Sequence, residues 1–242
     1  YTVAGNAFAV TGAITNNDGT NIQTLNTNVT PGSIAINAGT LQVGAAGRLS
    51  SGTYSGTLAN EGTFLYSGTN AQTLSGVISG SGGLTKNGSA TLTLSGANTY
   101  TGTTTVNAGT LEIGAAGRLG GGSYAGNIAN DGVLIYSGTS AQTLSGVISG
   151  TGALTQNASS TLTLSGNNTY SGATTINAGT LEIGAAGRLG AGTYAGNIAN
   201  DGVLIYSGTA AQTLSGVISG TGALTKNGSG TLTLTGANTH TG

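Results

Sequence analysis

Hydrophobic and polar residues alternate in short segments along most of the chain, with turn-forming residues between the segments. Residues 161–164 read Thr-Leu-Thr-Leu, and Leu111 and Ile113 flank Glu112 in the same way. A period of two residues predicts short strands that bury one side and expose the other. Residues 133–136 read Val-Leu-Ile-Tyr, so alternation does not define their inward side chains. Combinations such as Asn-Ala-Gly, Asn-Asp-Gly and Ser-Gly separate the segments and favour tight corners.

The segments belong to a tandem repeat with a constant period. The stretch 107–120 recurs almost unchanged at 177–190 and more loosely at 37–50, so the same offset, 70, separates each copy from the next. Such near-copies predict the same local structure in each repeat of one continuous solenoid. The predicted organisation is a divergent N-terminal coil or cap over residues 1–32, followed by three tandem repeats within 33–242, namely 33–102, 103–172 and 173–242.

Residues 1–32 match the repeat poorly, and a decayed repeat explains them as well as a cap does. The chain starts at Tyr1 without a methionine and ends at Gly242, which aligns with the middle of a repeat. We therefore expect a longer polypeptide, truncated at the C-terminal end, of which a signal peptide or anchor is missing.

Each repeat divides further at a Gly-x-Leu step that begins a short apolar stretch. These steps begin at Gly109, Gly132, Gly152 and Gly179, with spacings of 23, 20 and 27. Such lengths are typical of one coil of a parallel β-helix. The sequence therefore predicts an all-β fold, a parallel β-helix (β-solenoid) with about three coils per 70-residue repeat and leucine and isoleucine in its interior.

This subdivision also predicts a structural ladder of asparagine side chains. An asparagine lies two residues before the first and second Gly-x-Leu glycine of each repeat. If the coils are in register, each pair stacks its amides. The predicted pairs are Asn37 with Asn60, Asn107 with Asn130, and Asn177 with Asn200.

Composition removes several classes of function. The chain has 47 glycines, five Lys/Arg and six Asp/Glu, too few charges for ordinary solvated helices. A net charge of −1 gives no basic patch for nucleic acid. The absence of cysteine excludes disulfides and thiolate chemistry. No apolar run is long enough for a transmembrane helix, so we expect no direct membrane span in this segment.

Candidate chemistry is sparse. Glu112 and Glu182 are copies of one repeat position, surrounded by Thr, Asn and Gly, whereas a catalytic centre needs at least two ionisable groups converging on one cleft. No spacing of His, Asp or Glu is typical of a metal site. We therefore predict no catalytic, cofactor-binding or metal-binding residues.

Arginine and tyrosine provide the remaining candidates for contacts. Arg48, Arg118 and Arg188 each follow Gly-Ala-Ala-Gly, and with Glu112 and Glu182 they are possible repeated surface contacts for an acidic glycan or a protein. A solvated charge of little energetic value is the alternative. Six repeated tyrosines form either aromatic stripes for sugar stacking or packing at strand ends. They are Tyr54, Tyr66, Tyr124, Tyr136, Tyr194 and Tyr206.

One motif resembles a known family. Residues 152–172 read Gly-Ala-Leu-Thr-Gln-Asn-Ala-Ser-Ser-Thr-Leu-Thr-Leu-Ser-Gly-Asn-Asn-Thr-Tyr-Ser-Gly, continuing into Thr-Leu-Glu-Ile-Gly184, and the same pattern stands at 83–102 and opens again at 222–236. It resembles the autotransporter-associated β-strand repeat of type V secretion passengers. The resemblance implies a right-handed parallel β-helix outside a Gram-negative cell, commonly in adhesins. The carboxy-terminal translocator of that family is not in this chain.

These observations favour a structural cell-surface or extracellular protein, not an enzyme, that acts in adhesion or in matrix or biofilm formation. Its expected partners are a host or neighbouring cell surface, glycans or matrix components. A self-assembling extracellular fibre that polymerises head to tail is the alternative within this class. A polysaccharide-degrading β-helix enzyme is a remote alternative from another class.

Overall fold

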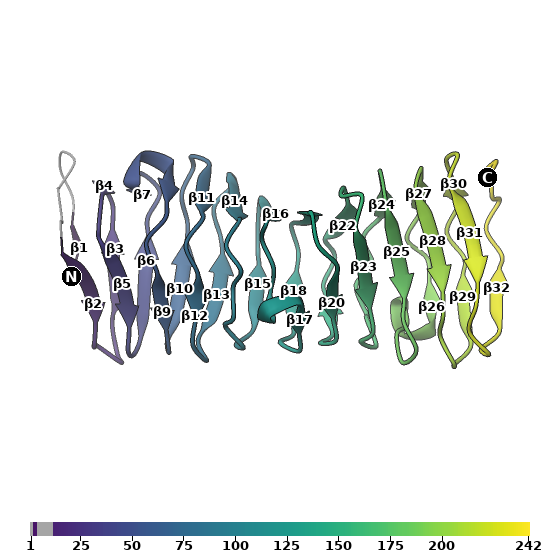
Figure 1. Cartoon of the computed structure of the whole chain (residues 1–242), viewed down its shortest axis with the longest axis horizontal. Helices are drawn as coiled ribbons and strands as arrows, with labels where there is room; N and C mark the ends of the chain where they lie inside the picture. The colour runs from purple at the N-terminus through teal and green to yellow at the C-terminus, as the bar shows by residue number, and fades with distance from the viewer. Residues whose placement is uncertain (1, 4–11) are drawn as a thin grey trace. The chain divides into compact units, whose positions relative to one another are not determined.

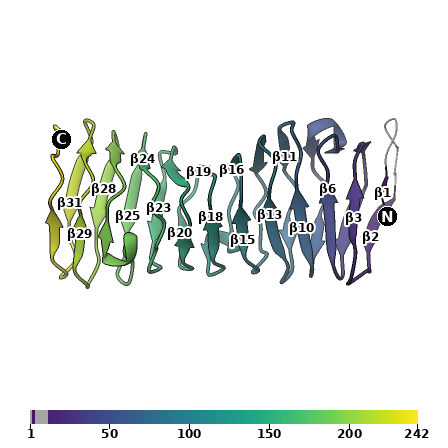
Figure 2. The ribbon, with the colours of Figure 1, turned by 180° about the vertical axis from the view of Figure 1, so that it is seen from behind.

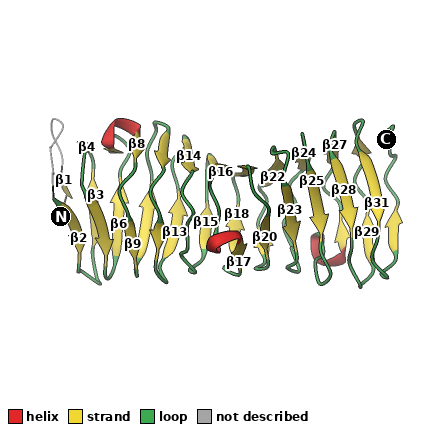
Figure 3. Ribbon diagram, in the orientation of Figure 1, coloured by secondary structure: helices red, strands yellow, loops and turns green. Residues whose placement is uncertain are grey.

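The computed structural model describes residues 2–3 and 12–242, and its regular structure is almost entirely β-strand (Figure 3). Within the described residues the helical segments are three short 3-10 turns, η1 at Ser50–Gly52, η2 at Gly120–Gly122 and η3 at Gly190–Gly192. None of the described helices is long and apolar enough to span a bilayer. The prediction of an all-β chain with almost no helix is confirmed.

The chain forms two compact units, Tyr1–Gly121 (unit 1) and Gly122–Gly242 (unit 2). The strands of unit 1 are β1 Thr2–Val3, β2 Ala13–Asn16, β3 Ile22–Leu25, β4 Asn28–Val29, β5 Ser33–Ile36, β6 Thr40–Val43, β7 Arg48–Leu49, β8 Thr53–Tyr54, β9 Leu58–Asn60, β10 Thr63–Tyr66, β11 Gln72–Leu74, β12 Ile78–Ser79, β13 Gly83–Lys86, β14 Thr91–Leu94, β15 Thr104–Val106 and β16 Thr110–Ala115. The strands of unit 2 are β17 Ser123–Tyr124, β18 Ile128–Asn130, β19 Val133–Gly138, β20 Gln142–Leu144, β21 Ile148–Ser149, β22 Ala153–Gln156, β23 Thr161–Leu164, β24 Thr174–Ile176, β25 Thr180–Ile183, β26 Thr193–Tyr194, β27 Ile198–Asn200, β28 Val203–Tyr206, β29 Gln212–Leu214, β30 Ile218–Ser219, β31 Ala223–Lys226 and β32 Leu232–Leu234.

In unit 1 these strands, apart from the separate pair β4-β7, stack in parallel into three sheets that the chain visits in turn (Figure 1). Face I has the order β1-β3-β6-β10-β13-β15, face II has β8-β11-β14-β16, and face III has β2-β5-β9-β12. One coil runs through β9, β10 and β11 and therefore passes from face III to face I to face II. This succession of short parallel strands is a β-solenoid, as predicted.

Unit 2 is built in the same way, and the view from behind shows its coils following one another (Figure 2). Face IV has the order β19-β22-β24-β27-β30, face V has β17-β20-β23-β25-β28-β31, and face VI has β26-β29-β32. Strands β18 and β21 pair in parallel with each other. The strands of the two units make about 11 turns of parallel β-solenoid.

Alternation of side chains forms the core, as the sequence predicts. Leu41, Phe64 and Leu84 are neighbours in register on face I and are almost completely buried. In the segment that alternation left undefined, Leu134 and Tyr136 point inward. Stacking identical or similar side chains on successive turns fills the narrow interior with few gaps.

The sequence repeat and the turn of the solenoid are out of phase. Leu41 lies beside Phe64, Phe64 beside Leu84, and Leu84 beside Thr104, so three full turns that start at Leu41 end at Thr104. The residue one repeat after Leu41 is Leu111, which lies on face II beside Leu92. One 70-residue repeat therefore makes about three and one third turns.

Unit 2 shows the same phase independently. Leu134 lies on face IV beside Leu154, whereas Leu204, one repeat later, lies on face V beside Leu181 and Leu224. In unit 2 the chain passes from face IV to face V through consecutive strands such as β27 and β28. In each unit, therefore, a step of one repeat moves a strand forward by one face.

This phase corrects one of the predicted coil spacings. The spacings of 20 and 23 correspond to real neighbours, as in Val133 with Ala153 and Thr180 with Val203. The spacing of 27 does not, because Leu154 lies beside Thr174 and not beside Leu181 of the next Gly-x-Leu step. A Gly-x-Leu step marks the start of a strand rather than of a coil, and the last step of each repeat begins on the next face.

The N-terminal segment is described in part. Ala13 lies beside Ser33 and Ile22 beside Thr40, so residues 13–25 contribute two strands to the first coils of unit 1. Residues 1 and 4–11, which belong to the same predicted segment, lie outside the described residues.

Candidate functional site

The feature that recurs in each repeat and departs from the regular coil is a corner loop, which we define in unit 2 as residues 184–192, between β25 and β26. Its last three residues form a left-handed turn, with φ of +55° at Gly190, +53° at Ala191 and +106° at Gly192. In unit 1 the equivalent Ser50, Ser51 and Gly52 also have positive φ. Glycine adopts this conformation without strain, whereas Ser50, Ser51 and Ala191 adopt it at a conformational cost.

A buried glutamine side chain anchors the loop of unit 2. Gln212 accepts a hydrogen bond from Leu189 N (2.8 Å) and donates from Nε2 to Leu189 O (3.0 Å). In unit 1, Gln72 binds Leu49 in the same way, at 2.9 and 3.1 Å. Both glutamines are about 1% exposed. Sequence reasoning missed them, although a glutamine at an inward position of an apolar strand was the available signal.

The arginines lie in these loops and are half-buried. The guanidinium of Arg188 packs against Gly192. A Cβ atom added to Gly192 would lie 3.8 Å from Arg188 Nη1. Arg48 packs against Gly52 in the same way, and its buried Nε has no hydrogen bond. Neither of these two guanidiniums forms an ion pair with a described residue.

The predicted glutamates do not join these arginines. Glu182 lies on the outer side of face V, where it accepts a hydrogen bond from Thr163 Oγ1 (3.5 Å). Glu112 accepts one from Thr93 Oγ1 (3.4 Å) on face II. Both glutamates are held by the preceding coil, and Arg48 and Arg188 keep an unneutralised positive charge.

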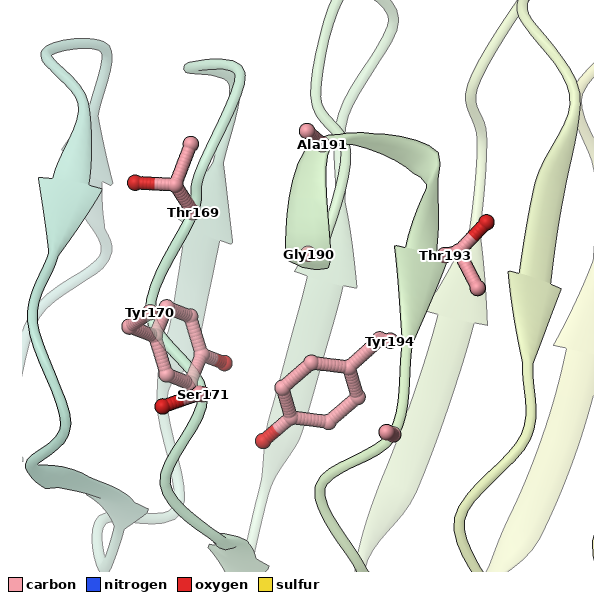
Figure 4. A pocket seen from close by; sticks show the side chains of 8 residues that line it. Thr169, Tyr170, Ser171, Gly190, Ala191, Thr193 and Tyr194 are labelled. Carbon is pink, nitrogen blue, oxygen red and sulfur yellow. The ribbon is translucent and has the colours of Figure 1, made fainter.

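A pocket of about 250 Å³ lies beside the loop of unit 2 (Figure 4). The coil that contains this loop is longer than the coil before it. Thr174 pairs with Ile198 one coil later, and that coil contains more residues than the one from Leu154 to its partner Thr174. The pocket lies beside the longer coil. Figure 4 shows the two tyrosine rings beneath Gly190 and Ala191. The pocket is lined by Thr169, Tyr170, Ser171, Gly190, Ala191, Thr193, Tyr194 and Ala195.

The tyrosine hydroxyls of this pocket are engaged within the protein. Thr174 Oγ1 lies 2.8 Å from the hydroxyls of both Tyr170 and Tyr194, and Tyr194 also donates to Gly172 O. The ring centroids are 5.4 Å apart. Burial raises the pKa of both tyrosines, so they remain protonated at neutral pH. The exposed rim offers threonine and serine hydroxyls, which suit an uncharged polar ligand such as a sugar.

The repeated tyrosines pack in the core. Tyr54, Tyr66, Tyr194 and Tyr206 are at most 2% exposed, and their hydroxyls donate to backbone carbonyls. Tyr124 and Tyr136 are buried equally well. Their ring faces are closed to a sugar, which favours packing over aromatic stripes.

An asparagine ladder exists, but the predicted pairs are wrong. Asn60 lies beside Ile36 in register, so Asn37 is one position further along and points outward while Asn60 is fully buried. Asn177 and Asn200 are offset in the same way in unit 2. A shift of one residue in a strand reverses the direction of the side chain.

The exposed asparagines instead bind residues 20 positions earlier. Their Nδ2 atoms donate to asparagine Oδ1 atoms at 2.6 to 3.0 Å, and the pairs are Asn37 with Asn17, Asn107 with Asn87, and Asn177 with Asn157. The buried asparagines each donate to the backbone one coil later, and these bonds are Asn60 to Gly83 O, Asn130 to Ala153 O and Asn200 to Ala223 O. Asparagine thus stabilises both sides of the corner.

Within the described residues no three His, Asp or Glu side chains gather in one place, so the structure offers no cluster of metal ligands.

Three stretches of the chain match the family model of the passenger-associated-transport-repeat, at residues 84–113, 154–183 and 224–242. No curated protein and no solved structure matches the chain.

Proposed function

We propose, from the premise that the chain is an autotransporter passenger repeat protein, that it is a structural segment of a bacterial adhesin or matrix protein. The passenger repeats indicate secretion to the cell surface or the extracellular space. The observation that carries the proposal is that the solenoid repeats one arginine-bearing corner loop, with an unneutralised charge at Arg48 and Arg188, instead of building one unique reactive site.

The loop arginines support acidic glycans or acidic matrix components as partners. Each contact is weak, since an exposed ion pair contributes about 0.2–1 kcal/mol. Repetition compensates for this weakness because a second contact within the same complex profits from a high effective concentration. The hydroxyl-rimmed pocket adds a place for an uncharged sugar next to the loop of unit 2.

Binding of the purified chain to surfaces coated with acidic or neutral polysaccharide tests this function. We expect retention on the acidic coating that decreases with added salt and with the triple substitution Arg48→Gln, Arg118→Gln and Arg188→Gln. Equal retention of the wild-type chain and the triple variant would count against recognition by the loops. Electron microscopy of the same samples examines the alternative, because filaments at high concentration would favour head-to-tail polymerisation.

A further inference from the structure

The two corner loops of unit 1, residues 44–52 and 114–121, lie on different sides of the solenoid. The loop 44–52 leaves face I after β6 and leads to face II, where Leu49 is held by Gln72 of β11. The loop 114–121 leaves face II after β16. The two loops are equivalent in sequence and differ in position by one face.

The arginines follow their loops. Arg48 lies beside Asn28 and next to the residue that Gln72 anchors on face II. Arg118 lies beside Ala97, and its carbonyl accepts a hydrogen bond from Asn98, whose side chain accepts one from Ile78 of face III. The positive charges therefore advance from one edge of the solenoid to the next as the chain advances by one repeat.

We propose that the corner loops trace a helical path around the solenoid of unit 1 and fit a flexible acidic polymer that winds around it, rather than a flat surface. This inference rests on the proposed function and specifies the shape of the partner. A flat surface touches one face and reaches one of the two arginines. A flexible chain can bend around an edge and reach both.

The charges of unit 1 support this path. Its third cation, Lys86, is completely buried, so the loop arginines provide the rest of its positive charge. Asp18 and Glu61 both lie at the corner between face III and face I, away from either arginine. Glu112 lies on face II in the strand just before the second loop and opposes an acidic partner there.

The spacing sets the length that a ligand needs. Three and one third turns correspond to a rise of about 16 Å at ~4.8 Å per turn. A disaccharide is too short to bind both arginines, whereas a long polysaccharide spans them. Because the second contact of a long chain is intramolecular, its affinity depends on both arginines together.

The test uses three probes and the full chain carrying Arg188→Gln and Lys226→Gln, so that the arginine and lysine side chains left are the loop arginines of unit 1 and the buried Lys86. The probes are polygalacturonate, its disaccharide, and large vesicles of anionic phospholipid. Adding Arg48→Gln or Arg118→Gln should each lower the affinity for polygalacturonate about two- to fivefold. For the disaccharide, each substitution should halve the number of binding sites on the chain and leave the Kd of the remaining site unchanged. For the vesicles, each substitution should lower the affinity by at most about twofold, the factor expected when one of two independent sites is lost.

Two further variants serve as controls. Glu112→Gln should raise the affinity for polygalacturonate, and Thr105→Val, on the outer side of face I, should leave it unchanged. Two outcomes would contradict the helical path and leave acidic binding itself intact. One is an equal affinity for the polymer and the disaccharide. The other is an affinity for vesicles that depends on both arginines as strongly as the affinity for the polymer does. Failure to bind all three probes would overturn the acidic partner and the path with it.

Discussion

The tight corner at 177–179 and the corner loop at 184–192 belong to the same coil of unit 2, yet they require glycine for different reasons. At Gly179 a Cβ atom would overlap the carbonyl oxygen of Ala158 on the coil before, and φ is +65°. At Gly190, φ is +55°, but the nearest atom to an added Cβ is 3.3 Å away, on Tyr194. The tight corner needs glycine for space and conformation, and the loop needs it mainly for conformation.

This difference separates a corner where the backbone of the neighbouring coil leaves no room for a side chain from a loop where a small side chain has room. The tight corner is closed by neighbouring backbone and by the bond from Asn177 to Asn157. The corner loop is fixed by Gln212 and by backbone hydrogen bonds to the preceding coil, such as the one from Arg188 N to Gly166 O. Its exposed residues are Ala185, Ala186 and Ala191. Recognition on a rigid scaffold is expected in such a loop.

The largest effect is expected at the tight corner. Gly179→Ala adds a clash with backbone to an unfavourable positive φ and should lower the free energy of unfolding by about 3–4 kcal/mol. The matched variant Gly190→Ala adds mainly the conformational strain, about 1–2 kcal/mol. Urea unfolding of both variants measures the difference, and equal losses would show that the two corners are alike.

Loss of the loop anchor should come next. Gln212→Leu leaves the N–H of Leu189 buried without a partner, whereas its C=O keeps the hydrogen bond from Gly192 N. The substitution should destabilise the chain by about 1–3 kcal/mol. Amide hydrogen exchange at Leu189 should accelerate strongly. Thr213→Val changes the neighbouring outward side chain and serves as the control. An unchanged exchange rate at Leu189 in Gln212→Leu would refute the anchor.

A small stabilisation is expected within the loop itself. Ala191 has φ of +53°, so Ala191→Gly removes strain but increases the entropy of the unfolded chain. The net gain should be about 0.5–1 kcal/mol, seen as a higher Tm. Ala199→Gly, in strand β27, should instead lower the Tm. A lower Tm for Ala191→Gly would mean that the left-handed turn is not strained.

The smallest effect concerns acid pH. Hydrogen bonds from the backbone and side chain of Thr151 hold the pKa of Asp131 below its usual value, and Ser81 does the same for Glu61. Their contribution is complete above the ordinary carboxyl pKa values and is lost as pH falls through the lowered ones. Tm should therefore decrease below about pH 4. Asp131→Asn should weaken that dependence, and an unaltered pH profile would contradict the role of Thr151.

Much of the fold was predictable because local patterns determine it. Alternation in residues such as Leu111 and Ile113 defines inward positions, and the spacings of 20 and 23 are real turns. The phase between repeat and turn was not predictable from those spacings, because a glycine step marks a strand and a coil contains three strands. The asparagine pairs were wrong for a related reason, since a shift of one residue moves Asn37 outward.

For the candidate site, the sequence predicted which residues belong to it but not where they lie in the fold. The sequence indicated Arg48, Arg118 and Arg188, but their distribution over different edges follows from pairing between coils far apart in sequence. The pocket beside Tyr170 and Tyr194 depends on the extra residues of one turn, a consequence of how coils stack. The anchoring role of Gln212 was hidden because its partner is a backbone group on the preceding coil.

The central claim, that a repeat advances by one face, is tested most directly by distances between paired spin labels. The chain has no native cysteine, so labels can be attached to Ala46 and Ala116 at equivalent exposed positions of the two loops of unit 1. The control pair is Gln42 and Thr105, which lie three turns apart on face I, about 14 Å at ~4.8 Å per turn. The loop pair should be clearly farther apart than the control pair, because its members lie at different edges. Equal distances would place both loops on one face and contradict the account.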